Sequence, residues 1–387
     1  MIRSTSSVHR KDKQFARVAI VHDYIKEYGG AERVLETLVE IYPDADIYTV
    51  FYSPSFLGPH RKRFEKLKTH TTWFQHVPFK NKLLSYFRLI APLVFKKIDL
   101  SAYDLIITSA TGTYTSPNFV KKSPKAKLIC YCHTPPRYLY GYSTAAPWNK
   151  IWWRKLIYIM GQIPIHFIRL ADFSSSQKPD YFIANSKEVA QRIQKYYRRD
   201  STIIYPPVEI RKISLNESKK DYYLTGGRLA RPKHTELSVL ACSRLGLTLK
   251  VFGREFSGYG KELHKIAGPT VEFLGEVNDD KKWELYRNAK AFLFPADNED
   301  FGIMPVEAMA SGIPVIAHRS GGATETVIEN KTGILFDELT VDSLTLAIRT
   351  FEKMKFNSND ITEQAQKFNK ERFIKEFKEF VAFASKS

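Results

Sequence analysis

The sequence predicts an α/β protein made of two doubly wound domains, each with its own parallel sheet. Short β-branched and aromatic runs alternate with segments whose apolar residues recur at helical spacing. The alternation pauses at Tyr205-Pro206-Pro207, because a double proline interrupts regular structure, and it restarts at residue 222. Strands that alternate with helices form parallel sheets with helices on both faces. A chain of 387 residues is long enough for two such domains.

The first half contains the elements of one sheet. Each strand candidate is a short run of β-branched, aliphatic and aromatic residues, and each helix candidate has an apolar face. The predicted strands span 17–24, 46–52, 104–110, 127–134 and 181–186, and the predicted helices span 29–42 and 187–197.

The second half repeats the same alternation and ends in a long basic helix. The predicted strands span 222–229, 247–253, 271–277, 291–296, 314–318 and 332–336, and the predicted helices span 235–244, 280–290, 304–310 and about 361–384.

These elements predict a tail, two domains and a final helix. Residues 1–14 are polar and basic without the apolar core of a secretory signal, and we expect a flexible tail. The N-terminal domain is expected over 15–205 and the C-terminal domain over 206–365. Residues 366–387 are expected to form a helix that packs back toward the N-terminal domain.

The composition is that of a globular protein with an anionic partner. Hydrophobic residues make up 43%, and 59 Lys and Arg against 41 Asp and Glu give a formal charge of +18. Such an excess suits a nucleic acid, an acidic membrane surface or a phosphorylated substrate. The three cysteines, Cys130, Cys132 and Cys242, fit a reducing cytosol and no zinc pattern, and we expect all three to be buried. No apolar run reaches the roughly 18 residues of a spanning helix.

Doubly wound sheets bind ligands beyond the carboxyl ends of their strands, so the loops there are the candidate site. The stretch from Asn298 to Val327 places Glu299 before a predicted helix and Glu307 inside it, with Gly302 between them. The N–H groups of a helix start favour a phosphate, and two flanking carboxylates suit a sugar on one side and a ribose on the other. On spacing alone, ordinary surface acids would be the preferred interpretation.

Three further loops carry suitable side chains. "TGGRLARPKH" supplies Arg228 and Lys233, which together neutralise a diphosphate but also fit a solvated basic loop. "HDYIKEYGGAERV" opens a helix with Gly29 and Gly30, either to offer N–H groups to a ligand or as a plain turn, and it lacks the dinucleotide fingerprint G-x-G-x-x-G.

The fourth loop, "YCHTPPRYLY", contains His133, Arg137 and Tyr138. His133 follows a predicted strand, where it could donate a hydrogen bond to a sugar hydroxyl or hold a charge beside the reacting carbon. Arg137 and Tyr138 could line an acceptor site. A lone histidine is more often structural, so this hypothesis depends on its position.

Together these motifs resemble the retaining family-four glycosyltransferases with a GT-B fold, over nearly the whole chain. The resemblance depends on the E-x7-E pair in "EDFGIMPVEAMASGIPVIA", on "GRLARPKH" and on "GGAERV". "ANSKEVAQRIQKYYRRDSTIIYPPV" and "GGATETV" are similar to the mannosyltransferases that build bacterial O-antigen (lipopolysaccharide) and capsule chains from GDP-mannose. In one departure, the usual Lys-Gly after the arginine is Lys233-His234 here.

The resemblance implies a role for each motif. Arg228 and Lys233 would hold the donor diphosphate, Glu307 the ribose and Glu299 the transferred sugar. Gly29 and Gly30 would face the diphosphate or acceptor, and His133 would stand near the anomeric carbon. The implied catalytic set is His133, Glu299, Arg228 and Lys233, and the other donor-binding residues are Phe252, Gly253, Phe301, Gly302, Ile303 and Met304.

The implied reaction retains the anomeric configuration and needs neither a metal nor a cofactor beyond the sugar nucleotide. The Asp44-Ala45-Asp46 sequence spells a metal motif of a different transferase fold, and we interpret it as structural. Rival interpretations are a UDP-sugar transferase, an epimerase or phosphorylase on the same fold, and a basic nucleic-acid-binding protein. The chain contains no phosphorylase lysine signature and no nucleic-acid-binding motif, and we expect no nucleic-acid partner.

Two basic and aromatic stretches suggest a cytoplasmic protein that lies peripherally on the inner face of the plasma membrane. Phe79, Leu83, Phe87, Ile90 and Val94 recur at near-helical spacing among lysines and arginines, and "KIWWRKLIYIM" repeats the theme. Such segments suit an anionic leaflet, although a core-facing helix with a basic face fits each stretch at least as well. A lipid-linked saccharide acceptor would follow from the first interpretation.

Overall fold

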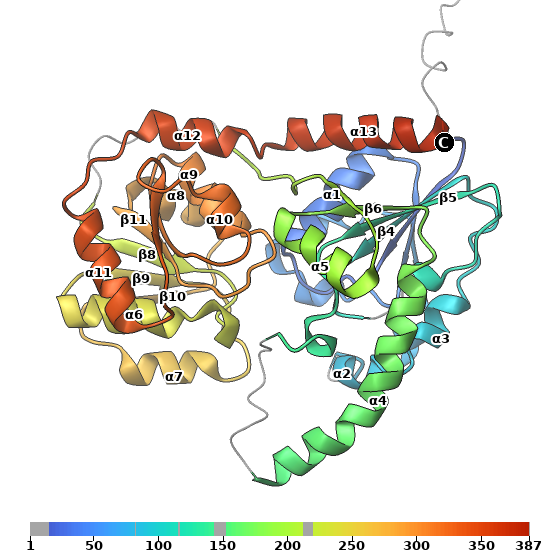
Figure 1. Cartoon of the computed structure of the whole chain (residues 1–387), viewed down its shortest axis with the longest axis horizontal. Coiled ribbons are helices and arrows are strands. Elements are labelled where there is room, and N and C mark those ends of the chain that lie inside the picture. Colours follow the sequence, from blue (N-terminus) through green and yellow to red (C-terminus); the bar gives the residue numbers. More distant parts are fainter. Residues whose placement is uncertain (1–14, 82, 115–116, 143–151, 212–219, 387) are drawn as a thin grey trace, which may run out of the picture.

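Two parallel sheets, each with helices on both faces, form two domains that lie side by side (Figure 1). The computed structural model describes residues 15–81, 83–114, 117–142, 152–211 and 220–386. The expected tail 1–14 lies outside the described residues.

The N-terminal sheet has the strand order β3-β2-β1-β4-β5-β6-β7, and all its strand pairs are parallel. Its strands are β1 (Val18–His22), β2 (Asp46–Thr49), β3 (Thr69–Thr71), β4 (Leu105–Ala110), β5 (Lys127–Cys132), β6 (Tyr181–Ala184) and β7 (Thr202–Ile203). The helices of this half are α1 (Gly30–Ile41), α2 (Leu84–Phe87), α3 (Ala91–Lys96), α4 (Trp152–Ser176) and α5 (Lys187–Tyr197).

Both faces of the sheet are buried at its centre, which explains why the central strands β1, β4 and β5 are mostly apolar runs. Ile20 of β1 packs with Leu35 of α1 and with Phe377 of α13 (Lys370–Lys386) on one face. Val21, the next residue, points to the other face and packs with Val94 of α3. Because successive side chains of a strand point to opposite faces of the sheet, the residues of β1 alternate between the two cores.

The C-terminal sheet repeats the same topology with the order β10-β9-β8-β11-β12-β13. Its strands are β8 (Tyr223–Gly226), β9 (Leu249–Phe252), β10 (Val271–Gly275), β11 (Ala291–Phe294), β12 (Val315–His318) and β13 (Gly333–Phe336). Its helices are α6 (Thr235–Leu245), α7 (Tyr259–Ile266), α8 (Asp279–Asn288), α9 (Ile303–Ala310), α10 (Ala323–Thr326), α11 (Val341–Phe351) and α12 (Ser358–Gln366).

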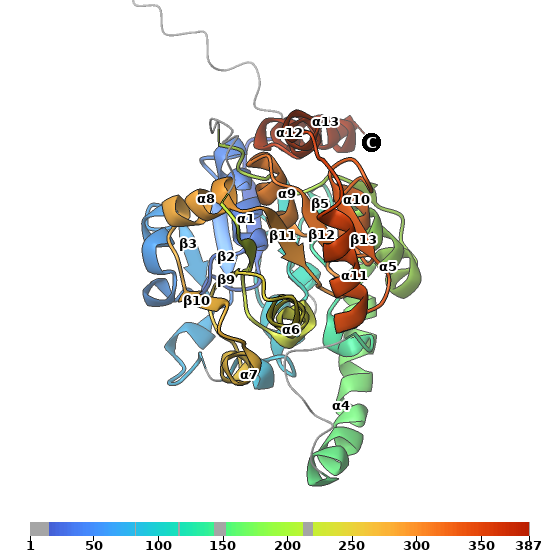
Figure 2. The ribbon, with the colours of Figure 1, turned by 90° about the vertical axis from the view of Figure 1, so that its left-hand side faces the viewer.

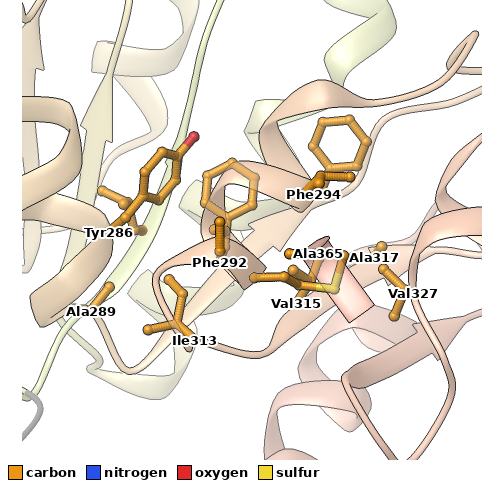
Figure 3. Close-up of a cluster of buried hydrophobic side chains, with 14 of the residues drawn as sticks. Tyr286, Ala289, Phe292, Phe294, Ile313, Val315, Ala317, Val327 and Ala365 are labelled. Atoms are coloured by element: carbon orange, nitrogen blue, oxygen red, sulfur yellow. The ribbon is translucent and has the colours of Figure 1, made fainter. Parts of the chain in front are cut away.

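One core of this domain lies between β11, β12 and the helices α8, α9 and α12. Figure 3 shows Phe292 and Phe294 of β11 beside Val315 and Ala317 of β12, all of them buried. Leu293, between the two phenylalanines, points to the opposite core with α6 and α11. The prediction of two doubly wound domains is therefore confirmed.

The predicted final helix is in fact two helices. α12 ends at Gln366 on the C-terminal domain, and α13 begins at Lys370. The chain breaks there because Asn369 Oδ1 accepts the N–H of Arg372 at 2.8 Å, which caps a new helix, while Phe368 is buried in the C-terminal core. Phe373 and Phe377 of α13 are fully buried in the N-terminal core, so the expected return to that domain is confirmed (Figure 1).

The two connections between the domains run side by side. Val208 N donates to Phe368 O at 3.0 Å, and Arg372 Nη2 donates to Tyr205 O at 2.8 Å. The region after the double proline and the region before α13 therefore form one paired crossing between the sheets.

Helix α4 was not predicted, because Gly161 and Pro164 interrupt its apolar sequence. It projects away from the rest of the molecule in both views (Figures 1 and 2). Within the described residues, no helix is long and apolar enough to cross a membrane.

Candidate active site

The loops singled out in the sequence follow the carboxyl ends of β1, β5, β8 and β11. In each sheet the strand order reverses beside the first strand, at β1/β4 and at β8/β11, and this is where doubly wound folds bind ligands. Contacts between the two domains bring the loops of the two sheets together.

Glu307 of α9 lies at the centre of a charged cluster that bridges the domains. Its side chain is almost fully buried, and its Oε1 accepts from Arg33 Nη1 of α1 at 2.6 Å and from Lys282 Nζ of α8 at 3.0 Å. Its Oε2 lies 3.4 Å from the Tyr286 hydroxyl. Burial raises the pKa of the Glu307 carboxyl, but Arg33 and Lys282 more than offset this, and the pKa lies below its usual value. Glu307 is thus a permanent anion and no ordinary surface acid.

Glu299 forms an ion pair with Lys233. Lys233 Nζ donates to Glu299 Oε2 at 2.5 Å and lies 5.4 Å from the centre of the Phe294 ring. Lys233 ends a short 3-10 turn (Arg231–Lys233), and Pro232 O of that turn accepts the N–H of Asp297 at 3.1 Å. The two predicted donor-binding loops are therefore bonded to each other.

Arg228 faces the N-terminal domain from the same edge. Its Nη1 lies 3.6 Å from Glu27 Oε1, and its side chain is 57% exposed, so it can reorient at low cost. Its guanidinium lies 5.7 Å from the Phe256 ring centre.

The start of α9 approaches the glycines of both domains. A Cβ added at Gly30 would lie 2.9 Å from Ile303 Cδ1, and one added at Gly227 would lie 2.5 Å from Met304 Sδ. Gly302 has a φ of +84°, which turns the chain from the Glu299 loop into the helix. The side chains of Ile303 and Met304 thus lie directly over these glycines, and a Cβ there would have to displace them.

The remaining predicted donor residues support these loops. Phe301 is buried and packs against Tyr205, and Phe252 is buried at the end of β9. Gly253 follows with a φ of +131°, directly against the backbone of Gly227.

The sequence suggested that Gly29 offers its N–H group to a ligand, but this N–H group has a partner within the protein. It donates to Glu32 Oε2 at 2.9 Å in a capping arrangement at the start of α1, so this amide is already bonded within its own loop. Arg33, one residue further along the same helix, is the group that reaches the opposite domain.

His133 ends a buried chain of polar side chains. Its Nε2 lies 2.9 Å from Ser109 Oγ, which lies 3.0 Å from His22 Nδ1, and His22 Nε2 lies 3.6 Å from Glu32 Oε1. Burial, with a smaller contribution from His22, lowers the pKa of His133 to about 3. The imidazole is therefore neutral at pH 7, which fits a hydrogen bond to a hydroxyl rather than a charge beside the reacting carbon.

The predicted acceptor residues Arg137 and Tyr138 lie in the loop that follows His133, and Arg137 contacts the C-terminal domain. The Arg137 guanidinium donates to Asp300 Oδ1 of the C-terminal domain at 2.8 Å. The Arg88 guanidinium stacks 4.1 Å above the Tyr138 ring.

Four charged residues of the site were missed in the sequence. Arg33 lies within the quoted "GGAERV" and Asp300 directly follows Glu299, so both were in view without a distinguishing pattern. Lys282 and Arg192 lie on predicted helices whose facing partners a linear pattern does not reveal.

The Asp44-Ala45-Asp46 sequence lies elsewhere, at the amino end of β2. Asp46 accepts from His70 Nε2 at 3.0 Å and from the Tyr103 hydroxyl at 2.8 Å. Across the described ranges, no three His, Cys, Asp or Glu side chains gather as a metal site.

Two facing Rossmann-like domains, with cations, buried acids and a helix start at their shared edge, define a glycosyltransferase of the GT-B type. The models of two families match the chain, "Glycosyltransferase Family 4" over residues 28–212 and "Glycosyl transferases group 1" over residues 208–368. The protein belongs to these family-four, group 1 glycosyltransferases and is a hexosyltransferase.

Similar proteins agree with this class. An alpha-1,3/1,6-mannosyltransferase ALG2 of Rhizomucor pusillus is 25% identical over 417 residues, covering 92% of this chain and 88% of the relative. A GDP-mannose-dependent alpha-mannosyltransferase of Mycolicibacterium smegmatis is 35% identical over 111 residues, covering 29% of each chain. A sucrose-phosphate synthase of Thermosynechococcus elongatus has the same fold, with a TM-score of 0.69 at 17% identity over 95% of this chain and 98% of that one.

Proposed function

We propose that the protein transfers mannose from GDP-mannose, with retention of configuration, onto a hydroxyl of a lipid-linked or polysaccharide acceptor. The observation that carries the proposal is the Lys233–Glu299 pair beside the start of α9, with the buried anion Glu307 one turn further on. Mannose and GDP are supported by similarity to the two mannosyltransferases.

The donor would bind with its diphosphate between Lys233, Arg228 and the first N–H groups of α9. Cations and helix N-termini are suitable ligands for this group, and Arg228 is exposed enough to turn toward it. Glu307 would accept the ribose hydroxyls, and Glu299 would accept hydroxyls of the sugar. Lys282 and Arg33 keep Glu307 ionised for that role.

In the proposed reaction, the bond between the anomeric carbon and the diphosphate oxygen breaks and GDP leaves. The acceptor oxygen forms the new bond on the same face, and its proton passes to an oxygen of the leaving diphosphate. The transition state carries positive charge on the sugar and negative charge on the phosphate, so the cations Lys233 and Arg228 stabilise it more than the ground state. The neutral His133 would orient a sugar hydroxyl and would accept no proton.

A calorimetric panel of GDP-mannose, UDP-glucose, UDP-N-acetylglucosamine and the free nucleotides tests the donor. We expect GDP-mannose and GDP to bind most tightly, and Lys233→Ala and Glu307→Ala to abolish transfer. Lys353→Ala, at an exposed lysine of the same domain, is the matched control. Preferred binding of a UDP-sugar would make the chain a UDP-sugar transferase, and release of free altered sugar without an acceptor would indicate an epimerase. Tight, salt-sensitive binding of duplex DNA with no sugar nucleotide bound would overturn the proposal.

We also propose that the N-terminal domain contacts an anionic membrane surface, where a lipid-linked acceptor would lie. Of the apolar stripe predicted in the sequence, Phe87 and Val94 are buried in the core, so the simpler interpretation holds for them. Leu93 of α3 and Phe167 of α4 are instead exposed, by 61% and 65%. Ile163 and Leu170 of α4 are exposed as well, as are Trp73, Phe79, Tyr86 and Leu89 in the stretch before α3.

The two segments lie at the same end of the domain, because α3 and α4 both pack against the short 3-10 turn Pro117–Phe119. Lys96 and Lys97 at the end of α3 are exposed beside them and suit acidic lipids. The side chains of residues 152–162, which include most of "KIWWRKLIYIM", lie outside the described ones.

Sedimentation with vesicles tests this surface. We expect binding to phosphatidylglycerol vesicles but not to phosphatidylcholine vesicles, and at least tenfold weaker binding for Leu93→Asp and Phe167→Asp, on the order of the cost of placing a charge in the apolar layer. The matched control is Leu346→Asp, at a C-terminal residue that is 66% exposed. Equal loss in all three variants, or no binding by the wild type, would contradict the proposal.

A further inference from the structure

Two arginines of the N-terminal domain hold the loop that carries Glu299. Arg137 Nη2 donates to Asn298 O at 2.6 Å and to Asp300 Oδ1 at 2.8 Å. Arg192 donates to the same two oxygens, from Nη2 to Asn298 O at 2.9 Å and from Nη1 to Asp300 Oδ1 at 2.5 Å. We propose that Arg137 and Arg192 are positioning residues, which fix the Glu299 carboxylate in its working place when the two domains are closed.

Its own domain holds the loop through Lys233, which binds the Glu299 carboxylate, and through backbone hydrogen bonds. Asn298 N donates to Ser320 Oγ at 2.9 Å, and Gly322 N donates to Glu299 O at 2.8 Å. The Asn298 carbonyl and the Asp300 carboxylate are bound from the opposite domain. Asn298 has a φ of +50°, a left-handed conformation that asparagine adopts more readily than most residues. The two arginines bind the residues directly before and after Glu299.

The cluster is electrically balanced only when the domains are closed. Arg192 is 2% exposed, and its Nε also donates to Glu188 Oε1 at 3.0 Å. With Arg137 and Asp300, the group contains two cations and two anions. Burial raises the pKa of Asp300, but Arg137 and Arg192 more than offset it, and the pKa lies below its usual value. Arg192 is the buried member of this set, so removing the Asp300 charge leaves a buried cation with one anionic partner fewer.

Helix α5, which carries Arg192, is itself oriented by the C-terminal domain. The Glu325 carboxylate of α10 accepts the N–H of Lys187 at 2.8 Å and that of Glu188 at 3.0 Å. A carboxylate at a helix N-terminus is favourable because of the free N–H groups and the helix dipole. α5 therefore contacts the C-terminal domain at two points, which aims Arg192 at the Glu299 loop.

The consequence for the reaction is that Glu299 reaches its final position late, on closure. An open protein would bind the nucleotide through the C-terminal domain alone, while Glu299 would be aligned for transfer only after the arginines engage. This inference rests on the proposed contact of Glu299 with the sugar. It also gives Arg137 a role different from the acceptor contact expected from the sequence.

The experiment combines Asp300→Asn, which keeps the shape but removes the charge, with Arg192→Lys, which keeps the charge but removes the fork. Transfer kinetics are measured with GDP-mannose, and GDP binding by calorimetry. We expect kcat to fall by on the order of 10-fold to 100-fold in each single variant, as for small misplacements of a catalytic group. The affinity for GDP should change by less than about threefold, because both residues act on the sugar side. The double variant should lose about as much as either single variant, because both changes remove the same contact.

The matched control is Arg63→Lys. Arg63 Nη2 also reaches across the domains, to Asp279 Oδ2 at 3.4 Å, but it does not touch the Glu299 loop. Its kcat should stay within about twofold of the wild type, as expected for an exposed ion pair. Melting temperatures identify any variant that fails to fold.

The outcomes separate this inference from the proposed function. If the wild type binds GDP and transfers mannose but Asp300→Asn keeps its kcat, the inference is wrong and the function stands. If the wild type binds no GDP, the proposed function fails first. Arg137→Ala decides between positioning and acceptor binding. If Arg137→Ala lowers kcat and the double variant with Asp300→Asn has no lower kcat than either single variant, Arg137 is a positioning residue. If Arg137→Ala instead raises the acceptor KM, and its effect on kcat/KM multiplies with that of Asp300→Asn in the double variant, the proposed role of Arg137 is wrong.

Discussion

The neutral, buried His133 should make the N-terminal domain less stable in mild acid. In the unfolded chain a histidine has a pKa of about 6.5, whereas burial lowers the pKa of His133 to about 3 in the folded chain. Between these values the unfolded state binds one proton more than the folded state. The stability that the neutral His133 contributes is therefore fully present above pH 6.5. It falls by about 1.4 kcal/mol per pH unit as the pH decreases toward 3. Between pH 7 and pH 5 the free energy of unfolding decreases only below pH 6.5, so His133 alone should lower it by about 2 kcal/mol.

The measurement is urea unfolding of the wild type and of His133→Gln at pH 7 and pH 5. The N-terminal domain is followed through hydrogen exchange of the amides in its buried strands β4 and β5, because the buried Trp283 would make tryptophan fluorescence report on the C-terminal domain. The difference in unfolding free energy between wild type and variant should shrink by about 2 kcal/mol on acidification. His76→Gln is the matched control, since that side chain is already solvated in the folded chain. A difference equal at both pH values, to within about 0.5 kcal/mol, would refute the reasoning.

Three further changes test other parts of the structure. Ser109→Ala removes the hydrogen bond that orients His133, and should lower kcat by about tenfold with little change in GDP affinity; steady-state kinetics that show only a raised donor KM would contradict this. Gly253→Ala would place a Cβ 1.7 Å from Gly227 O at a positive φ, and should cost roughly 3–5 kcal/mol by urea unfolding; a loss below 1 kcal/mol would show that the loop relaxes. Phe377→Ala empties a fully buried position under α13, and should cost about 3–5 kcal/mol and open α13 to proteolysis, whereas an unchanged melting temperature would show that the helix is not needed there.

The fold was predictable because the central strands of both sheets, such as β1, β4, β5, β11 and β12, are buried segments of a parallel sheet. Such segments must be apolar on both faces, and they stand out against helices with one apolar face. The break in the final helix was missed because it depends on tertiary contacts. The break at Asn369 exists because Phe368 belongs to one domain's core and Phe373 to the other's, and a hydrophobic pattern does not record which core a residue enters.

The grouping of the candidate site residues was predictable where they follow strands of the same sheet. Glu299 and Glu307 lie on one loop and helix, and Lys233 follows a strand that ends at the same edge. The partners supplied by the other domain were not predictable. Arg33 meets Glu307 across 274 positions of the chain, and Arg192 meets Asp300 across 108. Nothing in a linear sequence distinguishes such arginines from the many others of a chain with a formal charge of +18.

Most ion pairs between the domains have the cation on the N-terminal domain and the anion on the C-terminal domain. Cations of the N-terminal domain meet anions of the C-terminal domain in the pairs Arg33–Glu307, Arg63–Asp279, Arg137–Asp300 and Arg192–Asp300, and the described pair Arg228–Glu27 runs the other way. An anionic diphosphate between the domains would compete with Glu307 for Arg33 and would also be drawn to Arg228 and Lys233, while Arg137 and Arg192 stay bound to Asp300. Arg33 would therefore favour closure without a ligand and admit a charged donor, because the donor supplies the negative charge that the displaced Glu307 carboxylate had provided. Lys282 lets Glu307 give up Arg33 without becoming an unpaired buried anion, since it holds Oε1 of the same carboxylate from within the C-terminal domain.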